Sequence, residues 1–129
     1  MSGNRHTDWL RQAQNDLQSA GHLHAGGFNA QACYIAQQAG LKALKALCFA
    51  RGFDIVRTHS LFQLVRDLGE NGEVEACARE LDLFYISGRY PDAFPAGAPF
   101  ELISTEQAGR AMDAARRVLA FVAERLVAS

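Results

Sequence analysis

Basic side chains that suit a phosphate group occur at three places in this sequence. Lys42 and Lys45 are three residues apart, so on a helix they occupy neighbouring positions of one face. His59 follows Arg57 and Thr58 just before an expected helix, whose first N–H groups attract anions. Structural interpretations compete with these: the lysines form a solvated helix face, and His59 belongs to a helix cap.

The third place is the segment Arg89-Tyr90-Pro91-Asp92. Proline restricts the preceding residue to an extended backbone, which directs the Tyr90 ring away from the preceding helix. An arginine fork beside an aromatic ring suits a phosphate with its base, and Asp92 would orient Arg89. The alternative is that Arg89 and Asp92 form salt bridges that tie this loop to the rest of the chain.

Composition indicates one globular domain over residues 1–129, because 49% of the residues are apolar and 21% are charged. The 13 basic and 14 acidic side chains give a net charge of −1, so any anion site must be local. Cys33, Cys48 and Cys77 lack zinc or CxxC spacing and are expected to be buried thiols, and we expect no metal site. With no 18-residue apolar run and a polar start, a cytoplasmic location without membrane contact is expected.

The periodicity of apolar residues predicts three long helices, at about 8–24, 29–50 and 105–126. Two short helices are expected between them, one from Leu61 to Leu68 and one at about 73–86. No segment alternates for long enough to predict a strand. The chain is therefore predicted to be an all-α, up-and-down bundle of about five helices, with the three long helices packed antiparallel.

Local residues predict where these helices begin. Thr7 or Asp8 is expected to cap the first long helix and Asn29 the second. Ser104 and Gln107 have the spacing of a capping box before the third. Residues 87–103 contain all three prolines, so no helix is expected to run through them.

Taken together in chain order, these segments resemble the HEPN family, the higher eukaryote and prokaryote nucleotide-binding domains. The family's segment Gln-Ala-x-Glu-Lys-x-x-Lys-Ala is matched except that Leu41 replaces the glutamate. The resemblance covers nearly the whole chain and implies a helical bundle, a homodimer, and a minimal nucleotidyltransferase as partner in a toxin–antitoxin-like pair. It rests on Tyr34, on Gln38, Ala39, Lys42, Lys45 and Ala46, on Thr58-His59-Ser60-Leu61, and on Ser87-Gly88-Arg89-Tyr90-Pro91-Asp92.

Many members of this family are metal-independent ribonucleases with an Arg-x4-6-His motif. Here Arg51 precedes His59 by too many residues and Arg57 by too few, and no histidine follows His59. The missing motif favours a non-catalytic protein that binds a nucleotide, with or without magnesium. A metal-independent endoribonuclease, which would bind RNA, and a plain helical interaction protein are the alternatives.

For the nucleotide-binding interpretation, each candidate residue has an expected role. Lys42 and Lys45 would contact phosphate oxygens as point charges, and Arg89 would bind them as a fork. Tyr90 would stack on a base, and His59 would donate to a phosphate or ribose. The complete candidate site is Lys42, Lys45, His59, Arg89, Tyr90 and Asp92.

Overall fold

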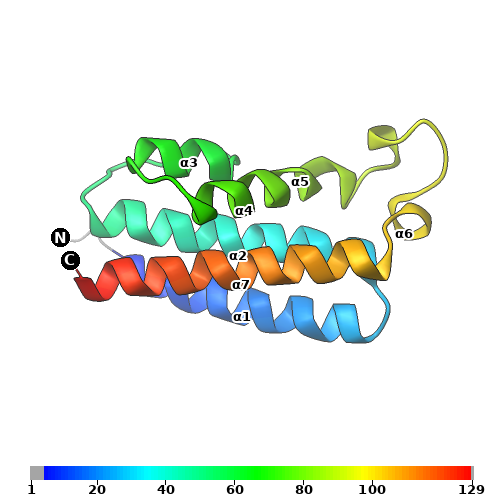
Figure 1. The fold of residues 1–129 in the computed structure, drawn as a ribbon, viewed down its shortest axis with the longest axis horizontal. Coiled ribbons are helices and arrows are strands. Elements are labelled where there is room, and N and C mark those ends of the chain that lie inside the picture. The colour runs from blue at the N-terminus through cyan, green and yellow to red at the C-terminus, as the bar shows by residue number, and fades with distance from the viewer. Residues whose placement is uncertain (1–4, 129) are drawn as a thin grey trace.

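Helices are the only regular secondary structure of residues 5–128, the part of the chain that the computed structural model describes. The all-α prediction is confirmed. The long helices α1, α2 and α7 lie within two residues of their predicted bounds (Figure 1). The elements are α1 (His6–Ala25), α2 (Asn29–Ala50), α3 (Leu61–Asp67), α4 (Glu73–Asp82), α5 (Phe84–Ser87), the 3-10 helix η1 (Pro91–Ala93), α6 (Pro99–Leu102) and α7 (Thr105–Ala128).

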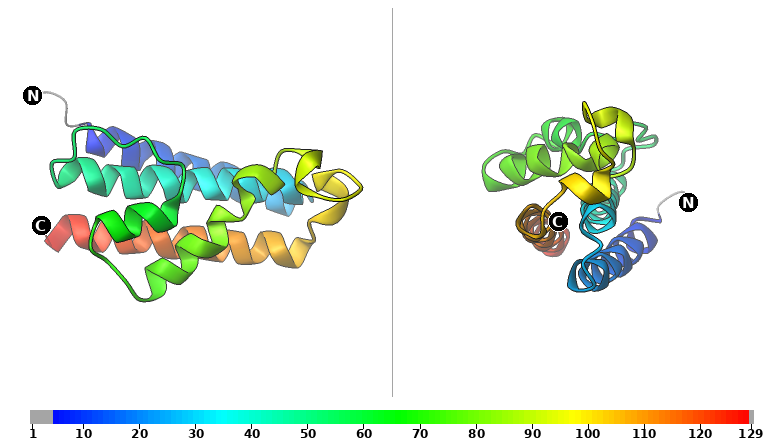
Figure 2. Two further views of the ribbon diagram at one scale, coloured as in Figure 1. Left: turned by 90° about the horizontal axis from the view of Figure 1, so that it is seen from above. Right: turned by 90° about the vertical axis from the view of Figure 1, so that its right-hand side faces the viewer.

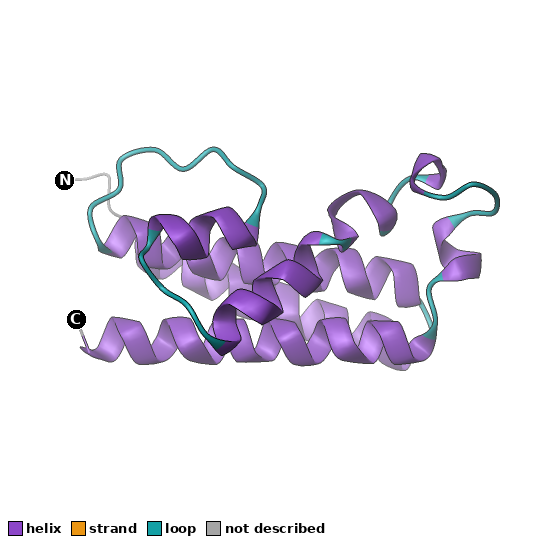
Figure 3. Ribbon diagram, turned by 45° about the horizontal axis from the view of Figure 1, so that its top comes forward, coloured by secondary structure: helices purple, strands orange, loops and turns teal. Residues whose placement is uncertain are grey.

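The bundle alternates in direction through α1, α2, the α4–α5 segment and α7 (Figure 1). The long helices α2 and α7 are therefore parallel to each other, and the predicted antiparallel packing of long helices is found for α1 with α2 and for α1 with α7. Helices α2 and α7 are parallel because residues 51–104 return the chain along the length of the bundle before α7 begins. Figure 3 shows the loop between α2 and α3 running back in this way.

Two of the predicted helix starts differ from the structure. The residue preceding α1 is Arg5, and Asp8 lies inside the first turn, where its carboxylate accepts a 3.1 Å hydrogen bond from Arg5 Nε. Asn29 is the first residue of α2, and its amide donates to Thr105 Oγ1 at 3.1 Å. The capping box before α7 is confirmed, because Gln107 Oε1 accepts from the Ser104 N–H at 2.8 Å and Ser104 Oγ accepts from the Gln107 N–H at 3.1 Å.

The helix expected at 73–86 is interrupted at Leu83, which separates α4 from α5. After α5, the proline-rich segment forms two short helical turns, η1 and α6, rather than an irregular loop. Each begins with a proline, Pro91 or Pro99, because the fixed φ of proline suits a first helical position where its missing N–H costs nothing. These turns place residues 89–102 at the end of the bundle where α2 and α7 begin (Figure 1).

Helix α2 is the centre of the core, as its apolar pattern predicts. It contacts α1, α7 and the α3–α5 segment, which surround it in the end view of Figure 2. A Cβ on Gly40 would lie 2.7 Å from Leu61 Cδ2 and 2.9 Å from Leu81 Cδ1, so a glycine here lets α3 and α4 approach the α2 backbone. Among the described helices, none has an apolar stretch long enough to cross a membrane.

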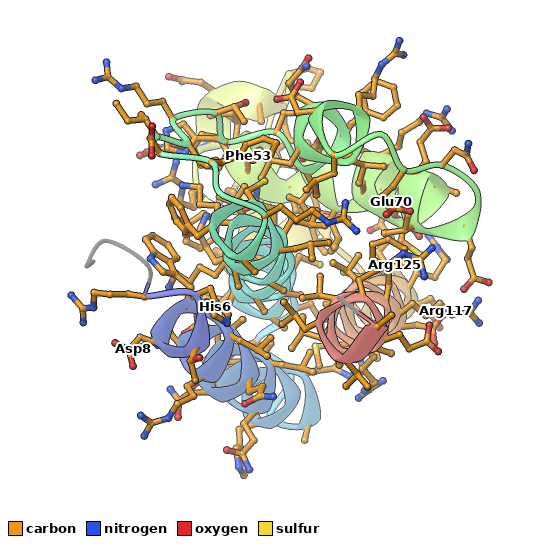
Figure 4. The ribbon with its side chains drawn as sticks, turned by 90° about the vertical axis from the view of Figure 1, so that its left-hand side faces the viewer. His6, Asp8, Phe53, Glu70, Arg117 and Arg125 are labelled. Atoms are coloured by element: carbon orange, nitrogen blue, oxygen red, sulfur yellow. The ribbon has the colours of Figure 1, made fainter. Side chains whose placement is uncertain are left out.

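Glu70 links three elements at the opposite end of the bundle. Its carboxylate accepts from Arg51 Nη2 at 3.0 Å and from Arg125 Nε at 3.1 Å, and Figure 4 shows Glu70 and Arg125 facing each other. The hydrogen bond from Arg125 is the main reason that the pKa of Glu70 is lowered; the bond from Arg51 adds to it and burial opposes it. This carboxylate therefore joins the ends of α2 and α7 to the loop after α3.

Candidate functional site

The backbone that carries Arg89 is held directly against α2. Gly88 ends α5, and a Cβ on it would lie 2.9 Å from the Phe84 carbonyl oxygen and 3.2 Å from the Ala30 carbonyl oxygen. Only a residue without a side chain fits at this contact. Tyr90 then has an extended backbone, φ −120° and ψ 133°, as its position before Pro91 predicts.

The guanidinium of Arg89 lies among three tyrosine rings. Its central carbon is 4.5 Å from the ring centroid of Tyr34, 4.7 Å from that of Tyr85 and 4.7 Å from that of Tyr90. These distances are those of cation–π contacts, which hold the flat guanidinium in a defined orientation. The side chain is half-buried, so its charge is partly shielded from water.

The hydrogen-bonding groups of Arg89 are only partly used. Its Nε donates to the Tyr85 carbonyl oxygen at 3.1 Å, and no carboxylate of residues 5–128 lies within ion-pair distance. The expected orienting role of Asp92 is therefore corrected: the backbone of α5 orients Arg89, while Asp92 is exposed in η1. The terminal N–H groups of the fork have no acceptor within the described residues.

A surface hollow of about 380 Å³ adjoins Arg89, and we refer to it as the Arg89 hollow. Arg89 is the charged residue of its lining, Tyr34 and Phe100 are its aromatic residues, and Gln31 contributes an amide. Phe100 is 71% exposed on α6. The full lining is Ala30, Gln31, Tyr34, Ile35, Gly88, Arg89, Pro99 and Phe100.

His59 lies next to this group without lining the hollow. Its ring stacks on Tyr85 with a centroid distance of 4.8 Å and an angle of 16° between the planes, so His59, Tyr85 and Arg89 form a continuous row. The ring is exposed, while the His59 carbonyl oxygen accepts from Nε2 of the fully buried Gln37 at 3.3 Å. Of the predicted site residues, the structure thus brings His59, Arg89 and Tyr90 together.

The N-terminus of α3 is occupied by an anion of the protein itself. Asp82 accepts from the N–H groups of Leu61 at 2.7 Å and Phe62 at 3.1 Å, and Ser60 Oγ accepts from the Gln63 N–H. The expectation that these amides are available to a ligand beside His59 is therefore wrong. Ser60, directly after His59, is the N-cap residue of this helix.

Lys42 and Lys45 lie on the side of α2 that faces α1. Lys42 Nζ donates to Asp16 Oδ2 at 2.6 Å, and Lys45 Nζ lies 5.5 Å from the centroid of the Trp9 ring. Both lysines are half-buried rather than on a solvated helix face, because α1 packs over their aliphatic stems. Burial, with a smaller contribution from Lys42, lowers the pKa of Lys45. Neither lysine lines the Arg89 hollow.

The three cysteines are buried free thiols, as predicted. Burial is the main cause that raises the pKa of Cys33 to about 12 and that of Cys48 to about 11, and it also raises the pKa of Cys77. A protonated thiol is a poor nucleophile and a poor metal ligand. The raised pKa values therefore keep these three buried thiols protonated at neutral pH.

Sequence reasoning missed several residues of the site. Gln31 and Phe100 line the hollow, and Tyr85 joins His59 to Arg89. One signal was available, since Gln31 and Tyr34 are three residues apart and share a face of α2. Asp82 gave no comparable signal, because its partners are about twenty residues away in the sequence.

Comparison with known proteins shows what the chain resembles as a whole. A family model described as the HEPN domain matches residues 6–126. The protein TT1696 from Thermus thermophilus is 42% identical with a TM-score of 0.89, and the match covers 94% of this chain and 98% of that one. ST0689, an archaeal HEPN homologue, is 34% identical with a TM-score of 0.82, covering 94% and 97%.

A third solved structure has the same fold at lower identity. It is an HEPN domain protein from Thermotoga maritima that is 28% identical, with a TM-score of 0.74, and the match covers 93% of this chain and 98% of that one. No curated protein shows a significant match.

Proposed function

The chain belongs to the HEPN domain family, and from this premise we propose that it is a non-catalytic module that binds a nucleotide in the Arg89 hollow. The observation that carries the proposal is the arrangement of Arg89, whose orientation is fixed by tyrosine rings while its terminal N–H groups have no protein acceptor among the described residues. A guanidinium fork in this state is suited to two oxygens of a phosphate.

The remaining lining of the hollow supports a nucleotide rather than an inorganic anion. Phe100 offers an exposed ring for a base, and base–aromatic stacking contributes about 1–3 kcal/mol. Gln31 offers both a donor and an acceptor to the polar edge of a base. His59 stacks on Tyr85, and the Tyr90 ring lies against the Arg89 guanidinium.

Calorimetric titration tests this proposal with the mono-, di- and triphosphates of the four ribonucleosides. Arg89→Ala should weaken nucleotide binding about tenfold or more, because a charge-assisted hydrogen bond contributes about 1.5–3 kcal/mol. The matched control is Arg11→Ala, whose side chain is 76% exposed on α1 and should leave binding unchanged. Absence of binding at millimolar nucleotide, or unchanged binding in Arg89→Ala, contradicts the proposal.

We further propose that the module acts in the cytoplasm as a homodimer with a minimal nucleotidyltransferase as its partner. Two exposed apolar side chains of α6, the helix beside the hollow, support an interaction surface, since exposed apolar residues gather at such surfaces. They are Phe100 and Leu102, which are 71% and 44% exposed.

Light scattering at micromolar concentration tests the dimer, and a single monomeric species contradicts it. Co-expression with a minimal nucleotidyltransferase tests the partner. The expected result is one complex in size-exclusion chromatography that Leu102→Asp disrupts. Separate elution of the two proteins contradicts that part of the proposal.

A further inference from the structure

The charge and size of the Arg89 hollow point to more than nucleotide binding in general. We propose that the hollow accepts a single phosphate group, so that its preferred ligand is a nucleoside monophosphate. This inference rests on the proposed function above and specifies the ligand class of the same site.

The positive charge of the hollow comes from one residue. Arg89 is the charged residue in its lining, and one guanidinium fork matches two oxygens of one phosphate. The other expected cations are engaged elsewhere: Lys42 pairs with Asp16 at 2.6 Å, and Lys45 lies over Trp9. A second or third phosphate would therefore gain no contact with these lysines.

An acidic residue lies close to Arg89 along the chain. Asp92 is exposed on η1, three residues after Arg89. Additional phosphates beyond the one at Arg89 would add negative charge near this carboxylate, which opposes their binding.

The volume of the hollow agrees with a small ligand. About 380 Å³ is near the lower end of the range for small-molecule sites, about 300–1,000 Å³. The Arg89 guanidinium already lies 4.5 Å from the centroid of Tyr34, so the exposed ring of Phe100 is the better stacking surface. The phosphate would then lie at Arg89 and the base at Phe100, with one ribose between them.

Titration of the wild-type chain with AMP, ADP and ATP, and with the same series of GMP, CMP and UMP, tests this inference. We expect the monophosphate of the preferred base to bind at least as tightly as its triphosphate, in EDTA and in magnesium alike. Phe100→Ala should weaken monophosphate binding about fivefold or more, because the stacking surface is lost. The matched control is Ile55→Ala, an exposed apolar residue outside the lining.

The outcomes separate this inference from the proposed function. A triphosphate that binds about tenfold more tightly than its monophosphate, with Arg89→Ala still weakening binding about tenfold or more, overturns the inference and leaves the proposed function standing. Binding that does not change in Phe100→Ala overturns the placement of the base. Absence of binding for every nucleotide overturns both proposals.

Discussion

The carboxylate of Asp82, at the end of α4, accepts a 2.8 Å hydrogen bond from the hydroxyl of Ser60, which precedes α3. The same carboxylate accepts from the backbone N–H groups of Leu61 and Phe62. One side chain therefore accepts hydrogen bonds from the first N–H groups of α3 and fixes the loop that carries His59. The main structural role of the segment from Thr58 to Leu61 is therefore to attach the start of α3 to the end of α4.

Removing this carboxylate should destabilise the chain. In Asp82→Ala, two backbone N–H groups and the Ser60 hydroxyl lose their acceptor in a half-buried position. We expect the free energy of unfolding, measured with urea, to fall by about 1–3 kcal/mol. The control Asp92→Ala, on an exposed turn, should change it by no more than about 0.5 kcal/mol. Equal free energies of unfolding for the two variants would contradict the role of Asp82 in attaching α3 to α4.

A methyl group at Gly88 should be harmful, whereas one at Gly21 should be tolerated. A Cβ on Gly88 would lie 2.9 Å and 3.2 Å from the backbone oxygens of Phe84 and Ala30, so Gly88→Ala should destabilise by about 1–3 kcal/mol. A Cβ on Gly21 would meet only Met112 Cε, at 3.9 Å, so Gly21→Ala should stabilise α1 by about 0.5–1 kcal/mol. Urea unfolding of both variants decides whether the backbone before Arg89 is packed as tightly as described.

Lys42→Ala should lower the free energy of unfolding more than the same substitution at an exposed lysine would. Its ammonium contacts Asp16, and the two side chains are only 27% and 13% exposed, so removing Lys42 leaves a carboxylate without its partner. We expect the free energy of unfolding, measured with urea, to fall by about 1–2 kcal/mol. A double-mutant cycle with Asp16→Ala should give a coupling energy above about 0.5 kcal/mol. Additive effects of the two substitutions would show that the pair contributes nothing.

The Glu70 network should make stability depend on pH under acidic conditions. Because the folded-state pKa of Glu70 lies below its ordinary value of 4.5, the network stabilises the chain above that pH and is lost as the pH falls through the folded-state pKa. Glu70→Gln should therefore be less stable than wild type at pH 7, and the difference should shrink below about pH 4.5. Unfolding curves from pH 7 to pH 3 measure this, and a constant difference would be contrary to expectation.

The fold followed from the sequence more completely than the site did. Helices α1, α2 and α7 are long and strongly periodic, and local residues such as Ser104 and Gln107 mark where α7 begins. The Arg89 region was found because Pro91 restricts Tyr90 locally. The partners of Asp82 and of Lys42 are far away in the sequence, and only the tertiary arrangement of the helices determines such pairs.

Both ends of the described chain lie at one end of the bundle, where α1 begins and α7 finishes, and the Arg89 hollow lies at the other (Figure 1). A molecule tethered to a sensor surface through either terminus would therefore present the hollow to the solution. An affinity tag or a fluorescent fusion at either end would likewise stay about a bundle's length from any ligand in the hollow. If the proposed function holds, immobilised and free protein should show the same nucleotide affinity.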